Sequence, residues 1–103
     1  MTAVVTAVFT PLEGRKDELV AALRETMPGV HAEPGCELYA IHDAEDGTVT
    51  MIEKWTTRED LDAHSRGEAV AALQAATGEL LAGPVDVVIM TPLPAGTAEQ
   101  GEL

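Results

Sequence analysis

The chain has 103 residues, a length that suffices for one domain with its own core. Of these residues 46% are hydrophobic, which is too high a fraction for a disordered chain. Its formal net charge of -12 would repel a phosphate backbone, so we expect no nucleic acid and no anionic membrane surface as partner. The single Cys36 cannot close a disulfide within the chain, and no signal peptide or membrane-spanning apolar run is visible, so we expect a cytoplasmic protein.

The chain begins with a predicted strand and an amphipathic helix. Residues 3–10 form a short, almost continuously apolar run, which is typical of a strand. The next segment has charged side chains on one side and, on the other, apolar residues at helical spacing: Leu19, Val20, Leu23, Met27 and Val30. Pro28 lies inside this pattern and cannot donate a hydrogen bond to Arg24, so we expect the helix to kink or end there.

A turn and two further strands come next. The sequence Glu-Pro-Gly-Cys at residues 33–36 is typical of a turn. Residues 36–42 then predict a strand, and residues 43–47 predict a hairpin turn. Residues 48–55 predict a third strand, because they are β-branched or apolar apart from two charged residues. This strand ends at Trp55, the only tryptophan of the chain.

A short helix is predicted directly after the third strand. Thr57 followed three residues later by Asp60 is a capping-box type of signal, so the helix should begin there. Leu61 and His64 are three residues apart and therefore share one helix face. Because Leu61 must point at the core, we expect the imidazole of His64 to point inward as well.

The last third of the chain predicts another helix and a fourth strand. After a break at Gly67, apolar residues recur with a helical period up to a stop at Gly83 and Pro84: Ala69, Val70, Leu73, Ala76, Thr77, Leu80 and Leu81. Residues 85–91 predict the fourth strand. We therefore expect a single domain over residues 1–93 and an extended or mobile tail over residues 94–103.

The order β-α-β-β-α-β indicates an α+β protein with a ferredoxin-like fold, in which the helices cover one face of a four-stranded antiparallel sheet. The first, third and fourth strands have apolar residues at both odd and even positions, whereas a sheet with one face in water would alternate. The second face must also be covered, and no element of the chain is left to cover it. A second copy is the economical explanation, so we predict a homodimer that packs sheet to sheet.

His64 is the best single candidate for a catalytic residue, because an imidazole in a cleft can act as a general base near neutral pH. The alternative is a histidine that only bonds a backbone carbonyl. A tryptophan such as Trp55 is more often a core residue than a ligand-binding one. Tyr39 could point its phenol into the same cleft as His64, or it could face solvent. Glu53 needs a partner because an unpaired buried carboxylate is costly. We favour a structural role for it, with a catalytic role as the alternative.

Motifs for bound cofactors are absent from the sequence. There is no glycine-rich nucleotide or phosphate loop, and no cysteine or histidine pair has the spacing of metal ligands. If the protein is an enzyme, we therefore expect it to work without a flavin, a nicotinamide or a metal.

Three segments resemble the antibiotic biosynthesis monooxygenase family: Glu33-Pro-Gly-Cys-Glu-Leu-Tyr-Ala, Met51-Ile-Glu-Lys-Trp and Leu61-Asp-Ala-His64. The similarity covers roughly residues 3–93, and Glu-x-Trp followed by Leu-x-x-His is its most specific part. It implies a dimeric α+β barrel of ferredoxin-like protomers with an apolar pocket in each. It also implies oxidation of quinols, anthrones or related aromatics by molecular oxygen without a cofactor. In this resemblance His64 is catalytic, and Trp55 and Tyr39 contact the substrate.

Two departures from the family pattern limit the resemblance. Many relatives have a second histidine about five positions after the first, where this chain has Ala69. The haem-degrading branch uses an asparagine, a tryptophan and a histidine, where this chain has Val8, His64 and Gln74, so we do not expect haem degradation. Two other function classes remain open. The protein could be a non-catalytic dimer that binds a hydrophobic ligand, or an isomerase on the same scaffold.

Overall fold

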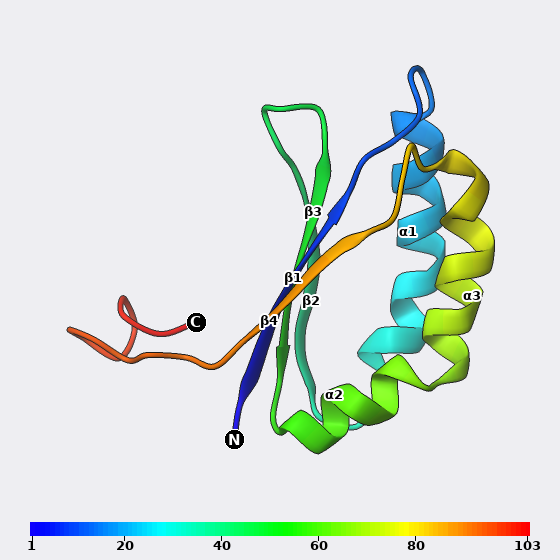
Figure 1. The fold of residues 1–103 in the computed structure, drawn as a ribbon. Coiled ribbons are helices and arrows are strands. Elements are labelled where there is room, and N and C mark those ends of the chain that lie inside the picture. Colours follow the sequence, from blue (N-terminus) through cyan, green and yellow to red (C-terminus); the bar gives the residue numbers. More distant parts are fainter.

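The computed structural model describes residues 1–103 and shows a four-stranded antiparallel sheet with helices on one face (Figure 1). The strands lie in the order β2-β3-β1-β4; they are β1 (Ala3–Phe9), β2 (Cys36–Asp43), β3 (Val49–Trp55) and β4 (Asp86–Met90). The helices are α1 (Lys16–His31), α2 (Arg58–Ser65) and α3 (Glu68–Thr77), and the 3-10 helix η1 (Gly78–Leu80) continues α3. The predicted ferredoxin-like α+β fold is confirmed.

The core lies between the sheet and the helices. Buried and half-buried residues alternate along β1 and β3, as expected when one face of each strand packs against helices. The largest side chains that are fully buried come from α1 and the sheet, namely Leu19, Leu23, Met51 and Trp55. None of the helices has the length and apolar character that crossing a bilayer requires.

Pro28 does not end α1, so the prediction of a helix end at this residue was wrong. The helix continues to His31, and the backbone N–H of Ala32 donates to the Pro28 carbonyl at 3.2 Å. A proline costs one hydrogen bond and steric strain, worth about 3 kcal/mol in a helix interior. Here it lies on the exposed side near the helix end, and Val30 beyond it is completely buried. Burial of that side chain offsets the cost in part, because it contributes roughly 1.5–3 kcal/mol.

The opposite face of the sheet, which we call the open face, has no covering element in this chain (Figure 1). Its apolar residues are half-buried or exposed: Val4, Val8, Leu38, Ala40, Ile52, Val88 and Met90. Every residue of β4 is exposed. The structure thus shows apolar side chains on both faces of the sheet, as the strand pattern indicates.

No helix or strand follows β4. Residues 91–103 run away from the helices and end in a turn closed by the Gly101 N–H, which donates to the Thr97 carbonyl at 2.8 Å (Figure 1). The C-terminal segment therefore adds no further helix or strand to the fold.

Candidate active site

A cavity of about 230 Å³ lies between the helix-facing side of the sheet and helices α2 and α3. Most of its wall is apolar, and its polar side chains are Tyr39, Glu53, His64, Ser65, Gln74 and Thr77. The hydroxyls of Ser65 and Thr77 donate to carbonyls of their own helices. The lining residues Val87 and Ile89 are about half exposed, so the cavity opens along β4.

One row of residues across all four strands forms the floor of this cavity. Tyr39 on β2 lies opposite Glu53 on β3, Glu53 lies opposite Val5 on β1, and Val5 lies opposite Ile89 on β4. All four line the cavity. The strand register thus places a phenol and a carboxyl beside each other on an otherwise apolar floor.

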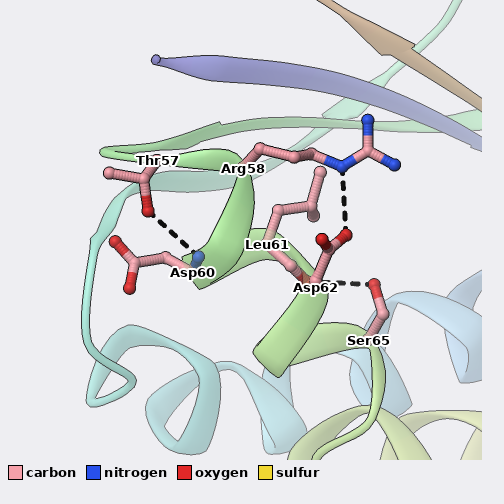
Figure 2. A network of polar contacts seen from close by, with 6 residues as sticks. All are labelled: Thr57, Arg58, Asp60, Leu61, Asp62 and Ser65. Carbon is pink, nitrogen blue, oxygen red and sulfur yellow. Dashed lines mark hydrogen bonds and ion pairs between the residues drawn. The ribbon is translucent and has the colours of Figure 1, made fainter.

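Helix α2 holds His64 over that floor. The Thr57 side chain accepts a hydrogen bond from the Asp60 N–H at 3.1 Å, so the helix begins where the sequence predicts (Figure 2). Figure 2 also shows the Arg58–Asp62 ion pair on the exposed side of this helix. Leu61 and His64 are both buried, 3% and 5% exposed, which confirms that they share the inward face.

A turn between α1 and β2 brings a second carboxylate to His64. Pro34 and Gly35 occupy the central positions of this turn, and the Cys36 N–H donates to the Glu33 carbonyl at 3.3 Å. Gly35 has a positive φ of 79°, and a Cβ atom there would collide with the Asp60 carboxyl. Only glycine meets both conditions, so it allows the turn to approach α2 closely.

The imidazole of His64 is fixed by Glu33, a residue that sequence reasoning assigned to a turn and missed as part of the site. His64 Nδ1 lies 2.6 Å from Glu33 Oε1. An ionised carboxylate only accepts hydrogen bonds, so Nδ1 must be the donor. In a neutral imidazole the lone pair is then on Nε2, which has no hydrogen-bond partner within the chain.

Trp55 supports the site from behind and is not part of the cavity wall. It is completely buried, its Nε1–H donates to Glu53 Oε1 at 2.9 Å, and its ring packs on His64 with a centroid distance of 4.6 Å. Of the residues that the family resemblance assigns to the site, His64 and Tyr39 line the cavity and Trp55 does not. The reason is that α2 begins three residues after Trp55 and covers the end of β3.

Tyr39 and Glu53 are both nearly inaccessible, at 4% and 6% exposure. Burial raises the pKa of the Tyr39 phenol well above its ordinary value of 10, and the nearby Glu33 carboxylate raises it further. Burial also raises the pKa of the Glu53 carboxyl above 4.5, although the Trp55 hydrogen bond and His64 offset part of this rise. No lysine or arginine pairs with Glu53.

Comparison with known proteins identifies the family. The family model described as "Antibiotic biosynthesis monooxygenase" matches residues 2–76. The chain belongs to this family. It is 32% identical over 95 residues to the "Putative monooxygenase Rv0793" of Mycobacterium tuberculosis, which covers 91% of this chain and 94% of that protein.

Solved structures agree with this family assignment. The structure of Rv0793 superposes with a TM-score of 0.85 at 30% identity, covering 94% of this chain and all (100%) of that one. A conserved protein from Methanosarcina mazei superposes with a TM-score of 0.81 over 87% of this chain and 91% of its own. At 20% identity, that second likeness concerns the fold alone.

Proposed function

We propose that this protein is a cofactor-independent monooxygenase that oxidises a small electron-rich aromatic, of the quinol or anthrone type, with molecular oxygen. One observation carries the proposal. His64 lies in the wall of an apolar cavity, its Nδ1 is bonded to Glu33 at 2.6 Å, and its Nε2 is left without a partner. This is the arrangement that a general base requires, with the base oriented by a third group.

The size of the cavity supports a small aromatic substrate. An apolar cavity of about 150 Å³ takes up one benzene ring. The present cavity, at about 230 Å³, is roughly one and a half times as large and is open along β4, so it can accept an aromatic larger than one ring. Its apolar walls match such rings, and few polar groups remain to orient them.

The proposed chemistry needs only the substrate, oxygen and a base. His64 Nε2 removes a proton from a phenol or from the methylene group of an anthrone. The resulting anion transfers one electron to O₂, and the carbon radical and superoxide combine to a peroxide. Loss of water then leaves a carbonyl group. The net change for an anthrone is CH₂ + O₂ → C=O + H₂O, and the substrate supplies every electron. The apolar wall keeps solvent water away from the substrate anion.

Oxygen uptake with a panel of quinols and anthrones tests the proposal. His64→Ala should lower turnover by roughly 10²–10⁴-fold, because a positioned base is lost. Quenching of Trp55 fluorescence by the ligand should persist, since Trp55 is the only tryptophan and remains in place. Glu33→Gln should also slow turnover, because the carboxylate that orients the imidazole is lost.

His42→Ala is the matched control, since His42 is an exposed histidine that bonds the Thr50 carbonyl and lies off the cavity wall. An unchanged rate in His64→Ala would exclude His64 as the base. Ligand quenching without oxygen uptake across the whole panel would instead indicate a binding protein or an isomerase.

A further inference from the structure

The cavity floor contains two polar groups that the proposed chemistry leaves without a role. Tyr39 and Glu53 lie directly opposite each other on β2 and β3. Opposite side chains on one face of an antiparallel pair have Cβ atoms about 4.5–5.5 Å apart, so the phenol and the carboxyl are neighbours. Both side chains line the cavity and both are more than nine-tenths buried.

Each of the two side chains has a polar atom without a partner in the chain. Glu53 Oε1 accepts the Trp55 Nε1–H, and the second carboxyl oxygen makes no hydrogen bond. The Tyr39 hydroxyl makes none either, although the backbone carbonyl of Tyr39 bonds the His31 ring. No side-chain oxygen or nitrogen that is sealed from solvent lacks a partner in this structure, so these two unpaired atoms both reach the cavity. A polar atom of a bound ligand can therefore bond them there.

We propose that Tyr39 and Glu53 form one hydrogen-bond-donating site for the substrate oxygen that becomes negatively charged when His64 removes a proton. This inference rests on the proposed function of the cavity. It assigns Glu53 a direct contact with the substrate in place of the purely structural role favoured by its sequence position. It also narrows the substrates to aromatics whose hydroxyl or carbonyl oxygen is conjugated with the atom that loses the proton.

Glu53 can donate only if it keeps its proton, and its surroundings favour that form. Burial raises its pKa, and the Glu33 carboxylate beside it acts in the same direction. The opposing groups are His64 and the indole of Trp55. Because the Trp55 N–H occupies Oε1, the proton belongs on the other oxygen, the one without a partner. Tyr39 stays protonated at neutral pH, since burial raises the pKa of its phenol above the ordinary value of 10.

Two neutral donors suit the step that His64 performs. The proton of the substrate goes to His64 Nε2, and the electron pair it leaves is delocalised onto the substrate oxygen. Tyr39 and Glu53 keep their protons and donate to that oxygen. Such donors are strongest in a site that excludes water, because they are already oriented when the charge develops. An ionised Glu53 would instead repel the anion.

Ionisation of a bound phenol tests this site without any oxygen chemistry. The probe is 4-nitrophenol, whose phenolate absorbs visible light, and the ratio of phenolate to phenol in the bound probe is measured against pH under anaerobic conditions. Tyr39→Phe and Glu53→Leu should each lower that ratio roughly 10–100-fold, because one hydrogen bond to a charged group is lost. Glu53→Gln should retain most of the ratio, since an amide both donates to the probe and accepts from Trp55.

Glu37→Gln is the matched control, because Glu37 is an exposed glutamate on the same strand as Tyr39 that pairs with Lys54. A clear increase in the phenolate ratio in Glu53→Gln would show that Glu53 is a negative charge and would overturn the proposal. An unchanged ratio in Tyr39→Phe, or failure of the probe to bind the wild-type protein, would overturn it too, even if Glu53→Leu does not fold. Absence of oxygen uptake would contradict the monooxygenase and leave this result standing.

Discussion

Glu33 and Glu53 carry the same carboxyl group in two different environments. Glu33 is one-fifth exposed and accepts a hydrogen bond from His64. Glu53 is buried on an apolar floor, has no cationic side chain paired with it, and has a raised pKa. Two carboxyls that differ in this way can have different roles: Glu33 can be the partner of a base, and Glu53 can be a neutral hydrogen-bond donor. At the residue scale, burial and neighbours therefore decide the chemistry, and the residue type does not.

The raised pKa of Glu53 makes stability depend on pH. The folded protein binds this proton more tightly than the unfolded chain, where the ordinary value of 4.5 applies. The contribution of this proton to the stability of the folded protein is fully present below pH 4.5 and is lost as the pH rises through the pKa of Glu53 in the folded state. Glutamine cannot ionise, so Glu53→Gln should gain stability relative to wild type as pH rises from about 4 to about 8. Chemical unfolding at one protein concentration measures this, and parallel curves for both proteins would contradict it.

At the scale of elements, α2 is the part that carries His64 into the site. A helix of eight residues is too short to be stable by itself. It is held by the burial of Leu61 and by the Thr57 cap at its start. The Arg58–Asp62 ion pair is about half exposed and contributes little. The burial of Leu61 and the Thr57 cap thus hold the helix, and the contacts with Glu33 and Trp55 then orient the imidazole of His64.

Loss of this cap should be measurable. Thr57→Ala should lower the free energy of unfolding by about 0.5–2 kcal/mol, because the Asp60 N–H loses its acceptor. Arg58→Ala is the control and should cost less than about 1 kcal/mol, as exposed ion pairs usually do. Denaturant unfolding of the two variants gives the comparison. If both cost the same, the Thr57 hydrogen bond is not what holds the helix start.

At the scale of the whole molecule, the open face is an apolar surface that no element of the same chain covers. It presents apolar side chains of all four strands. We expect two copies to cover it by packing sheet against sheet, with an interface above roughly 1,000 Å² in total. Light scattering at micromolar concentration should then give about twice the chain mass of 10.8 kDa. A stable, folded monomer would contradict this.

A pair of variants separates this interface from general surface effects. Ile52→Glu places a charge in the middle of the open face and should shift the protein towards monomer. Ala21→Glu is the control, since Ala21 is an exposed residue on α1, on the other side of the molecule. It should leave the mass unchanged.

The sequence by itself determined the features that depend on neighbouring residues. Hydrophobic period, turn residues and the Thr57 cap place every strand and helix within a few residues, because these signals act over one or two turns of chain. The inward direction of His64 follows from its spacing to Leu61, and the apolar character of both sheet faces is visible in the strands. Pro28 is the exception among local signals, since tertiary burial of Val30 carries α1 past it.

Only the tertiary structure decided which distant groups meet. Glu33 and His64 are 31 residues apart, and no periodicity relates a turn to a helix face. The pairing of Tyr39 with Glu53 depends on the strand register, because a slip of one residue would turn one of the two side chains to the other face of the sheet. The place of Trp55 behind the cavity wall depends on how closely α2 packs on the end of β3. Local patterns specify elements, whereas the contacts that make a site arise from packing between elements, where each side chain's environment includes residues far away in the chain.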